Sequence, residues 1–136
     1  MREHSYSLEV RWTGNLGKGT SEHMGFTRAH ELLAAGKQPI LASSDPVFRG
    51  DPARWNPEEL LVAALSSCHM LWFLYLAAQA GIVVVGYHDE PRGLMLERPG
   101  GGGSFREVVL RPQAPRAFAS TCLVASARLV VGQRRG

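Results

Sequence analysis

The chain has 136 residues and a mass of 14.9 kDa, with 45% hydrophobic and 20% charged residues. This length suits one domain, and the apolar content excludes a disordered chain, which has too few hydrophobic residues to offset the entropy of ordering. Two cysteines, Cys68 and Cys122, are too few for a disulfide scaffold. Because the N-terminus is polar and lacks the apolar core of a signal peptide, we expect a reducing, cytoplasmic location.

The net charge of +3 is unevenly distributed along the chain. Residues 1–103 hold nine basic and eleven acidic side chains, whereas residues 104–136 hold six arginines and one glutamate. A basic tail can bind nucleic acid, but these arginines are scattered and belong to no recognisable nucleic-acid-binding module. We interpret them as a solvated basic end and expect no nucleic-acid partner.

An N-terminal strand is predicted over His4–Thr13, because apolar residues occur there at every second position: Tyr6, Leu8, Val10 and Trp12. The glycine-rich turn at 14–19 is not a phosphate loop, because it lacks the Gly-Lys-Ser/Thr ending. Two short extended segments are expected around 24–33 and 38–43. Two prolines and a glycine then predict a loop over 44–55.

The clearest predicted element is a long helix that follows Asn56. Asn56 is a favourable N-cap, Pro57 suits the first helical position, and two glutamates come next. From Leu60 to Ala80 nearly every residue is apolar or small, and Gly81 ends the helix. We expect a helix that is apolar on all sides to be enclosed by other structure.

A membrane span is the alternative interpretation of this segment. Residues 60–85 contain no charged side chain and are long enough to cross a bilayer. The flanking residues show no clear excess of basic side chains on one side, and polar residues interrupt the segment at Ser66, Ser67, His69 and Gln79. We therefore expect no membrane association.

Three further strands are predicted after the helix. The segment 82–85 is a β-branched run typical of a buried strand, and 93–97 and 105–110 read as two more strands, joined by a glycine-rich turn. Strands, one long helix and then strands again favour an α+β fold over repeated βαβ units.

Cys68 lies in the middle of the predicted helix. Its simplest interpretation is a small buried hydrophobe, whose thiol is inert in apolar surroundings. His69 cannot easily activate it, because consecutive helical residues point about 100° apart. No CxxC or HxxxH spacing occurs in the chain, so we expect no metal site.

The residues around this cysteine resemble the OsmC/Ohr family of osmotically inducible and organic hydroperoxide resistance proteins. The most specific signature is Asn-Pro-Glu-Glu-Leu at 56–60, with a cysteine ten residues after the first glutamate. The sequence at 48–51 and the run at 55–70 also resemble the family, while those at 12–15 and 43–46 resemble one OsmC-like subgroup. The resemblance extends over residues 4–112. It implies an OsmC-like fold, in which a strongly bent antiparallel sheet packs around a long central helix, and an intertwined homodimer.

The resemblance also implies a thiol peroxidase that reduces organic hydroperoxides. In this family a helix cysteine becomes a sulfenic acid, a second cysteine condenses with it to a disulfide, and an external dithiol such as protein-bound lipoamide reduces the disulfide. By motif position Cys68 is the peroxidatic residue and Cys122 the resolving one. Glu58 matches the site glutamate and Arg49 the arginine that activates the thiolate, with Arg28 as the alternative arginine. No bound cofactor is implied.

Helix geometry restricts the proposed pair of Glu58 and Cys68. Ten residues correspond to about 15 Å along a helix axis. The two can share a site only if the helix bends sharply or if the glutamate comes from a second subunit. Otherwise Glu58 serves only as a helix-start residue favoured by the helix dipole.

The segment 112–136 departs from the family pattern. Cys122 is reached only twelve residues after Leu110, so about half of the expected connection is missing, and the ending at 131–136 is atypical. This leaves two alternatives to a complete peroxidase. One is a binding module that keeps an apolar pocket, and the other is an enzyme whose altered tail impairs resolution.

Overall fold

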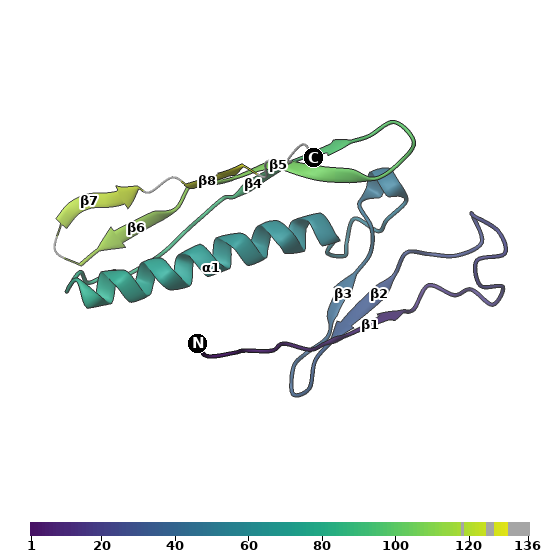
Figure 1. The fold of residues 1–136 in the computed structure, drawn as a ribbon, viewed down its shortest axis with the longest axis horizontal. Coiled ribbons are helices and arrows are strands. Elements are labelled where there is room, and N and C mark those ends of the chain that lie inside the picture. Colours follow the sequence, from purple (N-terminus) through teal and green to yellow (C-terminus); the bar gives the residue numbers. More distant parts are fainter. Residues whose placement is uncertain (118, 125–126, 131–136) are drawn as a thin grey trace. The chain divides into compact units, whose positions relative to one another are not determined.

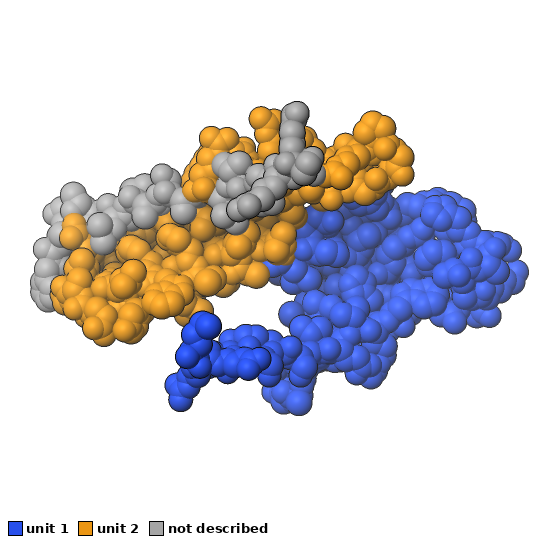
Figure 2. Space-filling model, viewed as in Figure 1, with its two compact units in different colours: residues 1–60 blue, residues 61–136 orange. Residues whose placement is uncertain are grey.

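The structure is a computed structural model that describes residues 1–117, 119–124 and 127–130. These residues form one α-helix, one 3-10 turn and eight strands (Figure 1). The chain divides into two compact units, residues 1–60 and residues 61–136 (Figure 2). The division does not test the single-domain interpretation, which stays a prediction.

Unit 1 contains a three-stranded antiparallel sheet in the order β1-β2-β3, formed by β1 (Glu9–Trp12), β2 (His30–Leu33) and β3 (Ile40–Ala42). The predicted N-terminal strand is confirmed only over its second half, as β1. The reason is that β1 pairs with β2, and β2 is only four residues long. The Trp12 indole donates to the Thr27 carbonyl at 2.9 Å, and its ring meets Phe26 edge-on. Those contacts fix the glycine-rich connection between β1 and β2.

The helix α1 (Pro57–Gln79) confirms the predicted element and its two ends. The Asn56 side-chain oxygen accepts from the Glu59 amide at 2.8 Å, and the Glu59 carboxylate accepts from the Asn56 amide at 3.2 Å, which is a capping box. At the other end Gly81 has a φ of 70°, and the Ile82 amide donates to the Ala77 carbonyl at 2.9 Å. This is a Schellman ending, and it requires a residue that tolerates a left-handed backbone.

The strands of unit 2 form two antiparallel sheets. One has the order β4-β5-β8, and the other pairs β6 with β7. The bounds are β4 (Arg92–Glu97), β5 (Gly103–Leu110), β6 (Gln113–Arg116), β7 (Ala119–Val124) and β8 (Ala127–Val130). The predicted strands at 93–97 and 105–110 are confirmed, whereas β6, β7 and β8 were not predicted.

The predicted buried strand at 82–85 is wrong in two respects. It forms one isolated bridge, Val84 with Arg116, rather than a ladder. The Val85 amide donates to the Pro115 carbonyl at 3.0 Å, but Pro115 has no N–H to return the bond, so regular pairing stops there. Val83 and Val85 are also exposed rather than buried.

One face of α1, which we call the inner face, contacts the segment at 87–93 (Figure 1). The Ser66 hydroxyl donates to Asp89 at 2.6 Å, and His69 Nδ1 lies 3.2 Å from the Tyr87 hydroxyl. Farther along, the Phe73 and Tyr87 ring centroids are 5.8 Å apart. Near the start of the helix, a Cβ on Gly93 would lie 2.7 Å from the Val62 side chain, so only glycine permits this approach.

The expectation that α1 is enclosed is wrong within the described part of the chain. Ala77 is its one buried residue. The hydrophobic residues that are buried in the described chain are few and mostly small: Ala42, Ala77, Val108, Leu110 and Ala114. A wholly apolar helix surface that faces solvent is costly, at about 25 cal/mol per Å². This surface is therefore a candidate site for contact with another molecule.

We predict that Asn56→Ala lowers the free energy of unfolding by about 1 kcal/mol, because it removes the acceptor for the Glu59 amide. Asn56→Asp keeps a capping oxygen and is the matched control. Urea denaturation followed by circular dichroism measures both. Equal stabilities of the two variants would show that the cap does not stabilise α1.

Candidate functional site

Cys68 is a free, exposed thiol on α1. Its face, which we call the outer face, lies away from the inner-face residues and holds exposed apolar side chains at helical spacing: Leu61, Leu71, Trp72 and Tyr75. The simplest sequence interpretation, a buried cysteine, is therefore wrong. The apolar neighbours of Cys68 in the sequence are divided between two faces of the helix, and the cysteine lies on the open one.

A shallow hollow of about 300 Å³ lies one turn beyond Cys68 on the outer face. It is lined by Leu71, Trp72 and Tyr75, which are three, four and seven positions after the cysteine. The Trp72 and Tyr75 rings meet edge-on with centroids 5.8 Å apart, and Trp72 is 62% exposed. Sequence reasoning missed these residues as functional candidates, although their i+3, i+4 and i+7 spacing from Cys68 was available as a signal.

His69 takes no part in the outer face. Its ring is hydrogen-bonded to Tyr87 on the inner face, as the angular separation of consecutive helical residues predicts. Burial, and secondarily the Asp89 charge, raise the pKa of Tyr87 above its usual value, so its hydroxyl is protonated well beyond neutral pH. His69 is thus a structural residue of unit 2.

Arg49 is held in an unusual backbone conformation in unit 1. It follows the 3-10 turn η1 (Pro46–Phe48), which the Asp45 carboxylate caps by accepting from the Val47 amide at 2.7 Å. Arg49 has a φ of 67°, the one positive value among the described residues other than glycine. Such a conformation costs about 1 kcal/mol or more and persists where the surroundings enforce it, as they often do at functional sites.

The loop around Arg49 is closed by short contacts. The Gly50 amide donates to the Asp45 carbonyl at 3.0 Å, and the Asp51 amide donates to the Ser43 hydroxyl at 3.1 Å. A Cβ on Gly50 would lie 1.5 Å from the Ser44 carbonyl oxygen, so no other residue fits there. The loop presents an exposed Arg49 side chain that makes no hydrogen bond or ion pair with any described residue.

The guanidinium of Arg28, the alternative arginine, contacts nearby residues of its own loop. Its guanidinium lies 4.4 Å from the Phe26 ring centroid and donates to the Phe26 carbonyl at 3.0 Å. A longer bond of 3.4 Å reaches the His23 carbonyl. Its charge is therefore committed to stabilising the connection between β1 and β2, whereas the Arg49 guanidinium is uncommitted among the described residues.

Glu58 lies in the first turn of α1, where the helix dipole favours a negative charge. Its Oε2 atom is buried and has no hydrogen-bond partner in the described part of the chain. An unpaired buried carboxylate oxygen is costly, because desolvation is not compensated. Because α1 is uninterrupted from Pro57 to Gln79 (Figure 1), the helix does not bend to bring Glu58 to Cys68.

Cys122, the proposed resolving residue, belongs to β7. The neighbouring pair Ala114 and Leu123 fixes its backbone beside β6. Its side chain lies outside the described part of the structure, so a disulfide with Cys68 stays a prediction. The atypical ending at 131–136 also lies outside the described residues.

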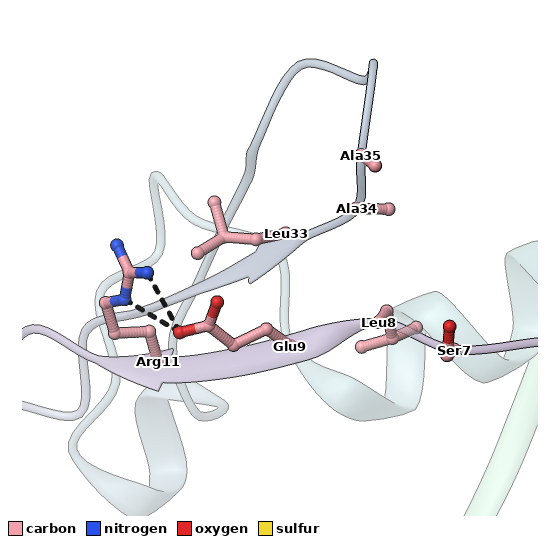
Figure 3. A pocket seen from close by; sticks show the side chains of 7 residues that line it. All are labelled: Ser7, Leu8, Glu9, Arg11, Leu33, Ala34 and Ala35. Carbon is pink, nitrogen blue, oxygen red and sulfur yellow. Dashed lines mark hydrogen bonds and ion pairs between the residues drawn. The ribbon is translucent and has the colours of Figure 1, made fainter.

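A second hollow, of about 450 Å³, lies beside β1 and contains none of the predicted site residues (Figure 3). Its two charged groups satisfy each other, because Arg11 and Glu9 form an ion pair at 2.9 Å. Both side chains are more than half exposed, so the pair is screened by solvent. The full lining is Ser7, Leu8, Glu9, Arg11, Leu33, Ala34 and Ala35. This hollow is lined by no cysteine, and its two charged side chains are paired with each other.

Metal-ligating side chains do not gather in the described ranges: no group of three or more His, Cys, Asp or Glu residues occurs there. The chemistry that the described residues can offer is therefore that of an exposed thiol beside aromatic side chains.

The mixed fold, with one main helix and antiparallel sheets, places the molecule among α+β proteins that carry a cysteine on a central helix. Residues 50–119 match the family described as OsmC-like protein. The solved structure of an OsmC-like protein of unknown function from Vibrio cholerae is similar, with 38% identity and a TM-score of 0.74, over 89% of this chain and 79% of that one. The chain belongs to the OsmC family. A comparison with curated proteins gave no match.

Family membership confirms the resemblance seen in the sequence and the OsmC-like type of fold. The family includes peroxidases, while the Vibrio cholerae relative has no known function. OsmC-like proteins are generally soluble. By length and composition α1 could cross a membrane, but a single apolar helix is weak evidence and does not indicate a membrane protein.

Proposed function

We propose that the protein is a cysteine-based peroxidase that reduces organic hydroperoxides in the cytoplasm. The observation that carries the proposal is the free, exposed Cys68 beside the hollow of Leu71, Trp72 and Tyr75. An aromatic and aliphatic surface beside a thiol suits the carbon chain of an organic hydroperoxide better than it suits hydrogen peroxide.

The proposed reaction begins with the Cys68 thiolate. Its sulfur attacks the terminal peroxide oxygen, an S–O bond forms, the O–O bond breaks, and the departing alkoxide takes a proton to become an alcohol. Sulfur loses two electrons and becomes a sulfenic acid. The Cys122 thiol then forms an S–S bond with that sulfur and water leaves, after which an external dithiol, such as a lipoylated protein, reduces the disulfide.

We infer that a second copy of the chain covers the outer face of α1. Leu61, Ala64, Cys68, Leu71 and Tyr75 follow a 3-4-3-4 spacing, the pattern of a seam between two helices. In the described residues α1 is the single α-helix, so the matching helix must come from another molecule. A twofold symmetric contact supplies an identical apolar face.

A homodimer also explains how Glu58 could lie near a Cys68 thiol although the two residues are far apart on one helix. Because the uninterrupted helix keeps the two residues about 15 Å apart in one chain, we propose that Glu58 and Arg49 reach Cys68 from the second copy. The unpaired Glu58 oxygen and the uncommitted Arg49 guanidinium support this proposal. A guanidinium can hold a carboxylate and a thiolate together.

A binding module is the second candidate function, and the outer-face hollow is the observation that favours it. Such a protein would take up an apolar ligand without consuming the thiol. Titration of free thiol after addition of cumene hydroperoxide separates the two candidates, because a binding module shows no rapid loss of thiol.

We predict that Cys68→Ser abolishes the consumption of cumene hydroperoxide without unfolding the protein, because serine nearly matches cysteine in size but is not oxidised. A ferric–xylenol orange assay measures the peroxide, and circular dichroism checks the fold. Cys122→Ser is the control, since it should retain the first turnover. Continued turnover in Cys68→Ser would end the peroxidase proposal.

We predict that Arg49→Ala slows oxidation of Cys68 about tenfold or more, because a nearby positive charge favours the thiolate. Arg49→Lys should recover part of the rate, having the charge without the planar fork. Arg28→Ala is the matched control and should leave the rate unchanged, since that guanidinium is engaged with Phe26.

Mixing variant subunits tests whether Arg49 acts across the dimer. Homodimers of Cys68→Ser and of Arg49→Ala each lack a complete site, but a hybrid dimer holds one site with both wild-type residues. Statistical mixing should therefore restore about a quarter of the wild-type sites. Mixed dimers that gain no activity would place Arg49 in the same subunit as its cysteine or outside the site.

We predict that one equivalent of cumene hydroperoxide converts the wild-type protein to a Cys68–Cys122 disulfide, whereas it leaves Cys122→Ser with a sulfenic acid on Cys68. A second equivalent should convert that sulfenic acid to sulfinic acid in Cys122→Ser but not in the wild type. Peptide mapping under non-reducing conditions measures both products. A free Cys122 beside an over-oxidised Cys68 in the wild type would show that the altered C-terminal segment has lost the resolving step.

A further inference from the structure

The rotation of α1 about its own axis is not determined by its apolar pattern. The outer face carries the large apolar residues Leu61, Leu71, Trp72 and Tyr75. The half-buried side carries Val62, Met70, Phe73 and Leu74 together with the polar residues Ser66 and His69, so both sides of the helix are apolar. Burial of apolar surface alone therefore does not choose which side faces the strands of unit 2, and another interaction must set the rotation.

The first such interaction joins Ser66 to Asp89. The Ser66 hydroxyl donates to Asp89 Oδ2 at 2.6 Å, a charge-assisted hydrogen bond. The other oxygen, Oδ1, accepts from the Arg111 backbone amide at 2.7 Å. Asp89 is thus held in place by the segment between β5 and β6, and through its bond to Ser66 it holds the middle of α1.

The second interaction lies one turn farther along the helix. His69 Nδ1 and the Tyr87 hydroxyl are 3.2 Å apart, and the Tyr87 ring also packs against Phe73. A phenol carries its proton at neutral pH, so the Tyr87 hydroxyl can donate this bond when His69 Nδ1 is unprotonated. All four polar side chains are half-buried, where such bonds are stronger than at the surface.

We propose that Ser66, His69, Tyr87 and Asp89 form a polar clamp that sets the rotation of α1 and thereby positions Cys68 on the outer face. Ser66 and His69 lie on either side of Cys68 in the sequence, so any rotation of this turn moves the sulfur with it. Loss of the clamp removes the bonds that choose between two apolar sides, so the helix can turn and carry Cys68 toward the strands. The four residues position the thiol and do not react, and the inference rests on the proposed function only in treating Cys68 as the reactive group.

The test uses the Cys122→Ser background, in which Cys68 is the single thiol of the chain. The variants Ser66→Ala, Tyr87→Phe and their combination remove the clamp bonds while leaving the Phe73–Tyr87 ring contact in place. Ser67→Ala is the matched control, because Ser67 is exposed, adjoins Cys68 and makes no side-chain hydrogen bond with any described residue. Ser66→Thr retains the hydroxyl and tests for rescue.

The measured quantity is the rate constant for alkylation of Cys68 by iodoacetamide in the native protein. We expect the double variant to react at least about fivefold more slowly as the thiol turns inward, with Ser66→Thr and Ser67→Ala close to the parent. Unchanged alkylation in the double variant, or an equal effect of Ser67→Ala, would overturn the clamp. If the double variant does not fold, the comparison of Ser66→Ala with Ser66→Thr decides the question in the same way.

Oxidation by cumene hydroperoxide, measured on the same proteins, separates this inference from the proposed function. A parent that does not react with the hydroperoxide refutes the peroxidase, while its alkylation rates still test the clamp. A parent that reacts, with alkylation and oxidation unaffected in every clamp variant, refutes the clamp alone.

Discussion

The arrangement of unit 2 depends on one constraint, a long helix that is apolar on two opposite sides and has strands along only one of them. The contacts from Val62 to Phe73 occupy the inner face, and the outer face remains open. Because both sides are apolar, burial alone does not determine which side faces the strands. Directional bonds through Asp89 and Tyr87 are needed to choose the side, and the position of Cys68 follows from that choice.

The sequence predicted α1 well because its signals are local. Asn56 and Glu59 reveal a capping box by spacing alone, and Gly81 marks the left-handed end. The strands after Leu110 were missed because two prolines suggested a broken segment. In the structure Pro115 lies at the irregularity in the β6–β7 pairing, a place where a missing N–H is tolerated. That position depends on the partner strand, which local sequence does not reveal.

The candidate site was predictable in part. The motif identified Cys68 and the family, but apolar neighbours on both sides in the sequence suggested a buried thiol, since a periodicity that is apolar everywhere cannot separate an inner from an outer face. Likewise, the sequence named Arg49 without indicating its backbone strain. Arg49 is the C-cap of η1, and its amide donates to the Pro46 carbonyl at 3.0 Å, so its left-handed backbone belongs to the end of that turn. Asp89 carried no sequence signal, because its two partners are more than twenty residues away.

The apolar surface that suits an organic substrate is unfavourable for a thiolate. The proposed site therefore needs a compensating positive charge near Cys68. An anion beside Trp72 and Tyr75 loses hydration and gains no compensating charge from α1, which has no ionisable cation between Leu60 and Gln79 other than His69. His69 is engaged on the inner face. A cation that stabilises the proposed thiolate would therefore come from another segment or another copy of the chain. In the proposed site Arg49 suits that role better than Arg28, because the Arg49 guanidinium makes no hydrogen bond or ion pair with any described residue, whereas the Arg28 guanidinium is engaged with Phe26.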